Sequence, residues 1–377
     1  MVQPASPGFE LLVGAQAFWE RARADLAAAR SRVLVQAMTF EADTAGSAVG
    51  AAITASTAAD RRVLVDDYTR NVINDTMLPL PFRPASVKRE ARATLAMFGQ
   101  MAACGVGVRI TNPVLGHPLR YPLRNHKKLL VLDQIAYIGG INFSDHNFAW
   151  HDLMLRIEGA PAADWLAADF GRDWAGEPLA AKAAFGAMDL ISFDGDGVRN
   201  AQHFAPLLAM VRSARRSVEM VSAYPTMPFV EAFAAAARSG ARATIYTPAP
   251  SNKPVVRDYL AAVAGPAGVE LRLLPEMTHA KALLIDGETL LLGSSNFNFA
   301  SYRTSSDFVA VIRDPALIAA FERDLLAPAR ESAVAAADLG IPAWRKLRGR
   351  LTLELADAAL ARLRHGPVRA IDWPVGA

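Results

Sequence analysis

The sequence contains a single cysteine, Cys104, among its 377 residues. One cysteine excludes an internal disulfide and a cysteine-rich zinc site, and it fits a reducing compartment. No stretch reaches the roughly 18 consecutive apolar residues that a membrane span requires. Residues 1–18 also lack the basic start and apolar core of a signal peptide. We therefore expect a cytoplasmic protein that is soluble or lies on a membrane surface.

Excess charge is also scarce, because 40 basic and 37 acidic residues leave a formal net charge of +3. The segment 341–370 carries seven basic and two acidic residues, a local charge of +5 that leaves −2 for the rest of the chain. Its basic residues are Arg345, Lys346, Arg348, Arg350, Arg362, Arg364 and Arg369. With 52% hydrophobic and 20% charged residues, the composition predicts a well-buried globular protein with a basic C-terminal tail.

The sequence indicates a divergent internal duplication of one α/β unit. In each half an apolar strand-like run precedes a helical stretch and a second strand. The predicted elements are 31–38, 45–59 and 62–66 in the first half, and 216–223, 229–239 and 243–246 in the second. This order predicts, in each half, a mixed, mainly parallel sheet flanked by helices. We expect domains at 1–180, with an insertion near 70–100, and at 190–330, followed by a tail at 331–377.

Each half also carries the pattern H-x-K-x4-D, at 126–133 and again at 279–286. In both copies an apolar run separates the lysine from the aspartate, and a small-residue turn ending in an asparagine follows, at Asn142 and Asn296. A lone histidine on an apolar strand is usually structural. Because the whole pattern recurs with matched spacing, we interpret it as functional, with the site at the interface of the two halves.

Six polar side chains, three from each motif, suit these motifs to phosphodiester chemistry. A His and a Lys two apart on a strand point to the same face. Lys128 and Lys281, with the amides of Asn142 and Asn296, can neutralise phosphate oxygens as charge develops. The two histidines can divide the remaining work, one attacking phosphorus and the other moving the proton. Lysine beside each histidine argues against a metal site, so we expect neither a metal nor a cofactor.

Acidic residues complete the pattern. Asp152 follows Asn142 by ten residues and Asp307 follows Asn296 by eleven, and each is suited to hold the second ring nitrogen of a histidine. Asp133 and Asp286 lie beyond the apolar run, so we expect them to be structural.

These motifs resemble those of the phospholipase D superfamily, over residues from about 31 to 313. The resemblance implies two lobes related by a pseudo-twofold axis, an active site at their interface, and a phosphohistidine intermediate. It assigns His126 as nucleophile and His279 as general acid/base. The segments 124–129, 137–144 and 150–159 look closest to bacterial cardiolipin synthases of the kind without transmembrane helices. Ser294 stands where the first copy has Gly140, and Asp307 where the family usually has glutamate.

The resemblance implies a phosphatidyltransferase of the cardiolipin synthase type, with a phospholipid such as phosphatidylglycerol as substrate. The same residues would serve a phospholipase D-type phosphodiesterase that uses water. A nuclease is a third alternative, but outside the tail the chain is slightly acidic, which does not favour nucleic acid as partner.

The tail has apolar residues at helical spacing, with arginines on other faces. They are Trp344, Leu347, Leu351, Leu355, Ala359 and Leu363. Such a helix either lies in an anionic membrane interface or packs on the protein core. The first alternative would place the protein peripherally at the inner face of the cell membrane.

Overall fold

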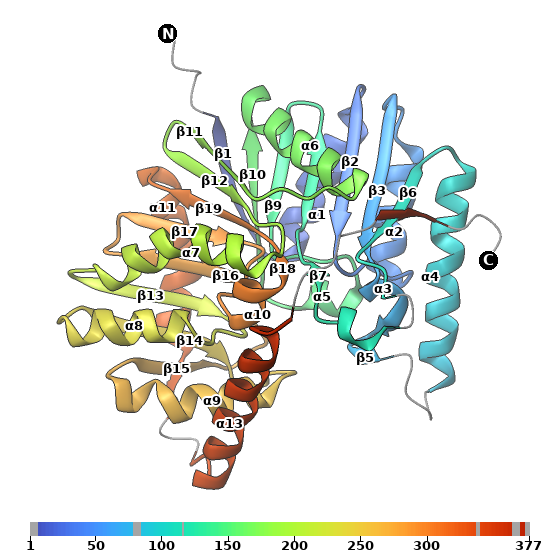
Figure 1. Ribbon diagram of the computed structural model, residues 1–377. Coiled ribbons are helices and arrows are strands. Elements are labelled where there is room, and N and C mark those ends of the chain that lie inside the picture. The colour runs from blue at the N-terminus through green and yellow to red at the C-terminus, as the bar shows by residue number, and fades with distance from the viewer. Residues whose placement is uncertain (1–6, 78–83, 115–116, 337–339, 364–369, 374–377) are drawn as a thin grey trace. The chain divides into compact units, whose positions relative to one another are not determined.

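The computed structural model describes residues 7–77, 84–114, 117–336, 340–363 and 370–373 (Figure 1). The chain forms two compact units. Unit 1 comprises residues 1–149, 154–179 and 366–377, and unit 2 comprises residues 150–153 and 180–365. Among the described helices, none combines the length and apolar character needed to cross a bilayer.

Unit 1 is built on an eight-stranded sheet in the order β1-β10-β9-β8-β2-β3-β6-β21. The strands are β1 (Gly8–Val13), β2 (Arg32–Ala37), β3 (Asp60–Asp66), β6 (Gly107–Thr111), β8 (Leu129–Leu132), β9 (Ile135–Gly139), β10 (Leu153–Glu158) and β21 (Ala370–Asp372). The central strands β2, β3 and β8 each contain consecutive buried apolar residues, such as Val33–Val35 and Val63–Val65, because helices cover both faces of the sheet.

Three helices of unit 1 pack on one face of this sheet and one packs on the other. α1 (Ala15–Ala28), α2 (Thr44–Ala55) and α4 (Ala85–Ala103) share a core with β2 and β3 that includes Phe18, Val35 and Phe98. α6 (Ala160–Ala175) covers the opposite face, where Asp173 accepts a hydrogen bond from Gln36 of β2. The shorter elements are α3 (Tyr68–Asn71), β4 (Val72–Ile73), β5 (Thr76–Met77), the 3-10 turn η1 (Pro118–Arg120), β7 (Arg124–Asn125) and α5 (Asp145–Ala149).

Unit 2 is built on a nine-stranded sheet in the order β11-β12-β19-β17-β16-β13-β14-β15-β20. The strands are β11 (Ala181–Phe185), β12 (Met188–Ser192), β13 (Ser217–Ser222), β14 (Arg242–Pro248), β15 (Glu270–Leu274), β16 (Lys281–Ile285), β17 (Thr289–Gly293), β19 (Phe308–Ile312) and β20 (Val334–Ala335). The short β18 (Ser305–Ser306) precedes β19.

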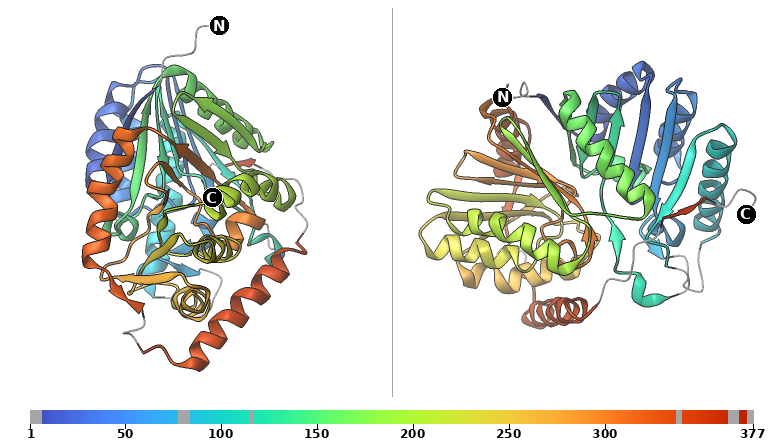
Figure 2. Two further views of the ribbon diagram at one scale, coloured as in Figure 1. Left: turned by 90° about the vertical axis from the view of Figure 1, so that its left-hand side faces the viewer. Right: turned by 45° about the horizontal axis from the view of Figure 1, so that its top comes forward.

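Helices cover both faces of this sheet as well (Figures 1 and 2). α7 (Gly197–Arg212), α8 (Phe229–Arg238) and α9 (Pro254–Val263) share a core with Val218 and Met220 of β13. On the other face, α11 (Pro315–Phe321) continues through the π-helical turn η3 (Glu322–Leu326) into α12 (Ala327–Ser332). There Arg330 pairs with Glu219 of β13 at 2.6 Å. The remaining helices are α10 (Phe299–Arg303), the 3-10 turn η2 (Gly265–Ala267) and α13 (Ala343–Leu360), which packs on α9.

The strand order confirms the internal duplication. The run β10-β9-β8-β2-β3-β6 in unit 1 has the same order and the same strand directions as β19-β17-β16-β13-β14-β15 in unit 2. The six elements predicted from the two halves are also confirmed, as β2, α2, β3, β13, α8 and β14.

The expectation that the sheets are mainly parallel is wrong. Only β2, β3 and β6 in unit 1, and β13, β14 and β15 in unit 2, pair in parallel with a neighbour, among pairings in the described residues. The strands that follow each motif form antiparallel hairpins, β8–β9 and β16–β17. The β-α-β pattern indicated only β2 and β3, and their counterparts β13 and β14, because a helical crossover joins each of these pairs, whereas the tight turns of the hairpins contain no helix.

Candidate active site

Both motifs occupy the same place in their units, immediately before or at the start of a central strand. In unit 1 the residues 126–128 form an extended segment between β7 and β8. In unit 2 the residues 278–280 precede β16, and Lys281 begins it.

The two motif lysines make equivalent hydrogen bonds. Lys128 Nζ donates to the carbonyl oxygen of His126 at 2.8 Å, and Lys281 Nζ donates to the carbonyl oxygen of His279. Both lysines are fully buried. Burial lowers the pKa of Lys281 to about 8, although the charges of Asp152 and Asp307 oppose this shift. Each ammonium group is thus fixed beside the backbone of its own histidine.

The second motif has a complete histidine–carboxylate pair. His279 Nδ1 lies 2.8 Å from Asp152 Oδ2, and both side chains are buried. Asp152 Oδ1 also accepts the Leu153 amide at 2.8 Å. A carboxylate in this position holds one ring nitrogen and orients the imidazole for proton transfer at the other. The sequence named Asp152 as an orienting acid, and the structure pairs it with the histidine of the other copy of the motif.

Backbone contacts hold this pair in register. The His279 amide donates to the His151 carbonyl at 2.8 Å, and the His151 amide donates to Met277 at 3.0 Å. Thr278 Oγ1 donates to the same His151 carbonyl at 3.1 Å. The segment 150–153 is therefore bound to the start of the second motif, which explains why it belongs to unit 2.

The other predicted acid, Asp307, is held by Ser294. Ser294 Oγ donates to Asp307 Oδ1 at 2.7 Å and accepts the Phe308 amide at 2.9 Å. The preceding Gly293 allows this close approach of β17 and β19, since a Cβ there would lie 2.2 Å from the Phe308 carbonyl oxygen. This contact accounts for a glycine at that position of the second motif.

The two predicted asparagines differ in their surroundings. Asn142 Oδ1 accepts the Thr39 amide at 3.3 Å, and its Nδ2 donates to Asn147 at 3.4 Å. Asn296 Oδ1 is buried and makes no hydrogen bond with the described residues. This amide oxygen therefore has unused capacity to accept a hydrogen bond.

Asp133 binds its hairpin to the start of β2, and Asp286 binds its hairpin to the start of β13. Both occupy the left-handed region, at φ 51° and 53°. Asp133 accepts the amides of Arg30, Ser31 and Arg32 at 2.8–2.9 Å. Burial acts to raise the pKa of Asp133, but these hydrogen bonds together lower it to about 2. Asp286 accepts three amides of the segment 215–217 in the same way.

A buried network behind the first motif was missed from the sequence. Lys127 is fully buried and pairs with Asp169 at 2.6 Å and Asp173 at 3.0 Å, both on α6. Asn125 also donates to Asp173, at 2.9 Å. The sequence feature that could have indicated this network is the spacing of Asp169 and Asp173, four residues apart on a largely apolar helix.

A second buried pair supports the same segment. Arg124 Nη1 lies 2.6 Å from Asp66, which also accepts the Asn125 amide at 2.6 Å. Burial raises the pKa of Asp66 to about 6, against the lowering effect of Arg124.

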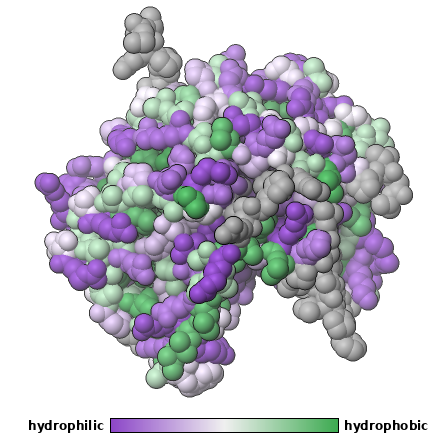
Figure 3. All heavy atoms as spheres, viewed as in Figure 1, coloured by the Kyte–Doolittle hydropathy of each residue, from purple (hydrophilic) through white to green (hydrophobic). Residues whose placement is uncertain are grey.

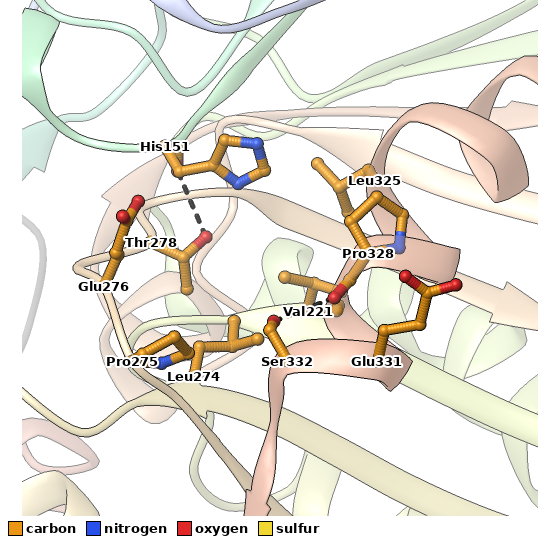
Figure 4. A pocket seen from close by; sticks show the side chains of 11 residues that line it. His151, Val221, Leu274, Pro275, Glu276, Thr278, Leu325, Pro328, Glu331 and Ser332 are labelled. Atoms are coloured by element: carbon orange, nitrogen blue, oxygen red, sulfur yellow. Dashed lines mark hydrogen bonds between the residues drawn. The ribbon is translucent and has the colours of Figure 1, made fainter.

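A pocket of about 480 Å³ in unit 2 adjoins the segment that carries Asp152 (Figure 4). Its apolar lining includes Leu274 and Leu325, and Figure 4 shows Glu276 and Glu331 on opposite sides of it. His151 also lines it, and burial lowers the pKa of His151. A pocket with apolar walls and a few polar groups suits a ligand that is itself amphiphilic.

Three carboxylates in unit 1 could hold a cation. Glu41, Asp43 and Glu90 each offer an oxygen, and these oxygens lie within 4.8 Å of one another. Burial raises the pKa of Glu41 to about 8. Glu41 can therefore carry a proton at neutral pH, which relieves the repulsion in this cluster without an ion.

The duplicated sheets and the repeated His–Lys segments define a phospholipase D-like protein. The chain belongs to the family described as "Cardiolipin synthase, PLD-like domain", whose profile matches residues 23–174 and 207–327. This confirms the resemblance inferred from the two motifs.

The chain is also similar in sequence to curated cardiolipin synthases. The chain is 26% identical over 239 residues to a cardiolipin synthase of Listeria monocytogenes serotype 4a, covering 56% of this chain and 48% of that protein. It is 28% identical over 234 residues to cardiolipin synthase 1 of Staphylococcus epidermidis, covering 54% and 47%. The chain thus spans about half the length of the curated relatives it matches.

Two solved structures share the fold. The crystal structure of phosphatidylserine synthase from Haemophilus influenzae Rd KW20 has a TM-score of 0.69 at 14% identity, covering 95% of this chain and 97% of that one. Polyphosphate kinase from Porphyromonas gingivalis has a TM-score of 0.55 at 12% identity, covering 86% and 50%. At these identities the likeness shows the two-lobed α/β fold alone, which the sequence predicted.

Proposed function

We propose that the protein is a phosphatidyltransferase of the cardiolipin synthase type, which transfers a phosphatidyl group between alcohols. The proposal rests chiefly on one observation, the buried pair of His279 and Asp152 at 2.8 Å with Lys281 on the adjoining strand. Membership of the family and the names of the relatives support a phospholipid as the class of substrate, and we propose phosphatidylglycerol as an example.

In the proposed mechanism His126 attacks phosphorus. A phosphorus–nitrogen bond forms while the bond to the leaving alcohol breaks, and His279 protonates that leaving oxygen. His279, now neutral, then accepts the proton of an incoming hydroxyl, whose oxygen displaces His126 from phosphorus. Asp152 keeps the His279 ring oriented and stabilises its protonated form.

The remaining motif residues are proposed to bind the phosphate. Lys128 and Lys281 neutralise charge on its oxygens, and the amides of Asn142 and Asn296 donate hydrogen bonds to them. Asp307 is proposed to act as the second orienting acid, positioned by Ser294. This mechanism calls on no metal ion and no cofactor, and its lipid substrate would place the protein at the inner face of the cell membrane.

Water as acceptor gives the alternative, a phospholipase D-type phosphodiesterase with the same residues. The pocket beside His151 favours an amphiphilic ligand over a nucleic acid, because Leu274 and Leu325 line it and the carboxylates of Glu276 and Glu331 would repel phosphates of a nucleic acid. We therefore retain hydrolysis of phospholipids as the second candidate and place a nuclease below it.

The test is incubation with mixed phospholipids followed by mass spectrometry of the lipid products. We expect cardiolipin and free glycerol from phosphatidylglycerol, and a loss of at least about 1,000-fold in His126→Ala. His203→Ala, which changes a histidine on α7 outside the motifs, is the matched control and should keep its activity. Phosphatidic acid as the sole product would establish hydrolysis instead, and turnover that persists in His126→Ala would refute the mechanism.

A further inference from the structure

Helix α13 has a buried face that is seated directly on α9. Gly349 and Leu353 are its buried residues. A Cβ at Gly349 would lie 2.7 Å from the backbone nitrogen of Tyr259, so the two helices approach to backbone contact at this point. Glycine is the residue that permits such an approach.

Ion pairs fix the orientation of α13. Arg345 lies 3.0 Å from the fully buried Asp258 of α9, and Arg348 lies 3.5 Å from the same carboxylate. Near the other end, Asp357 pairs with Arg303 of α10 at 2.8 Å. With both ends paired and Gly349 in contact, the helix cannot rotate about its axis, so the face it presents to solvent is determined.

That outward face carries a row of large apolar side chains, which we call the α13 stripe: Trp344, Leu347, Leu351 and Leu355. They are 62%, 58%, 49% and 69% exposed, and they make up four of the nine large hydrophobic residues that are exposed in the described part of the chain. Their spacing of three or four residues places them on one side of the helix. Figure 3 shows apolar surface running along α13 with hydrophilic residues beside it.

Basic side chains border the α13 stripe. Arg348 and Arg350 are 55% and 56% exposed, and the Arg348 guanidinium lies 5.2 Å from the centre of the Trp344 ring. Lys346 adds a further positive charge to a helical half, 343–350, that contains no acidic residue. Helix α13 has four basic residues, all within 343–350, whereas its two acidic residues, Glu354 and Asp357, lie further along. Its positive charge therefore lies in the half that carries Trp344 and Leu347.

We propose that the α13 stripe, with Arg348 and Arg350, docks the protein on an anionic lipid membrane. Leucines would enter the boundary between headgroups and acyl chains, Trp344 would lie at the interface, and the arginines would pair with lipid phosphates. The inference rests on the proposed function in that the same membrane would present the substrate. Under this proposal both alternatives for the helix hold: one face of α13 packs on the protein core, and the opposite apolar face binds the membrane.

The test measures sedimentation of the full chain with vesicles of phosphatidylglycerol and phosphatidylcholine, and with phosphatidylcholine alone. We expect binding that requires phosphatidylglycerol and weakens with salt. Leu351→Ser/Leu355→Ser should weaken it at least about tenfold, since two exposed leucines lose their apolar contact with lipid. The matched control, Leu179→Ser/Val198→Ser, changes two equally exposed residues outside α13 and should bind as the unchanged protein does.

Two readouts separate this inference from the proposed function. His126→Ala should bind vesicles normally and lack turnover, whereas the α13 variant should turn over dispersed short-chain phospholipid normally and lose turnover on vesicles. Vesicle binding that is unaffected by the α13 variant would overturn the inference. It would also be overturned if the variant instead converts a dimer to a monomer without lipid, which would assign the stripe to a second copy of the chain.

Discussion

Replacement of Asp152 by asparagine tests how much the negative charge of this orienting acid contributes to catalysis. Asparagine has nearly the same shape, and its Oδ1 can still accept a hydrogen bond from His279 Nδ1. The change therefore keeps the contact at 2.8 Å and removes the negative charge. In the proposed mechanism, that charge stabilises His279 most strongly when His279 is protonated.

The expected loss follows from Coulomb's law. Two unit charges about 4 Å apart interact by roughly 4 kcal/mol at the effective dielectric of about 20 that suits such protein sites. Because about 1.4 kcal/mol corresponds to a factor of ten in rate, Asp152→Asn should reduce kcat by roughly 1,000-fold. KM should change little, because Asp152 touches His279 and not the substrate.

The assay is steady-state release of glycerol from phosphatidylglycerol, with circular dichroism to confirm that the variant is folded. A second readout comes from Lys281: burial lowers its pKa, and the charge of Asp152 opposes that lowering. Removing this charge should move the alkaline limb of the pH–rate profile to lower pH. A loss below about tenfold in a folded variant, or a change in KM alone, would refute the positioning role of Asp152.

The other predictions concern charge and packing around the motifs. Activity of the unchanged protein should fall as pH rises through about 8, because Lys281 loses its proton there and not near its usual 10.5; a flat pH–rate profile up to pH 10 would contradict this. Asp133→Ala should lower the free energy of unfolding, measured in urea, by about 2 kcal/mol. This difference should shrink as pH falls toward the pKa of Asp133, about 2. The reason is that a carboxylate with a lowered pKa stabilises the fold only while it is charged. Lys127→Met should cost about 3–5 kcal/mol because it removes the fully buried cation that Asp169 and Asp173 share, and equal urea midpoints would argue against the pairing. Gly293→Ala should cost about 1–3 kcal/mol by overpacking against β19, measured by thermal unfolding, whereas an unchanged Tm would show that the strands separate freely.

The repeated units were predictable from the sequence because their signals are local. Apolar runs such as 31–38 and 216–223, each followed by a helical stretch, carry their periodicity within a few residues. The antiparallel hairpins that follow the motifs were not predicted, since a turn at Asp133 or Asp286 looks much like any other polar residue between apolar runs.

The residues of the proposed site come from the sequence, whereas the contacts between them come from the structure. Matched spacing identified the motif residues, but the partner of each acid depends on contacts between residues far apart in the chain. Asp152 and His279 are 127 residues apart, and no local pattern specifies their pairing. The Lys127–Asp169–Asp173 network was missed for the same reason. For α13, helical spacing revealed an apolar row, but the packing of Gly349 on α9 and the ion pairs of Arg345 and Asp357 show that the row faces outward.

The central claim is that His126 carries the phosphatidyl group during transfer, and the most direct measurement is to trap that adduct. The protein would be quenched in base during turnover of labelled phosphatidylglycerol, digested, and its peptides analysed by mass spectrometry. We expect label on the peptide that contains His126, and no label on the corresponding peptide of His126→Ala. Label on His279, or turnover with no histidine adduct at all, would contradict it.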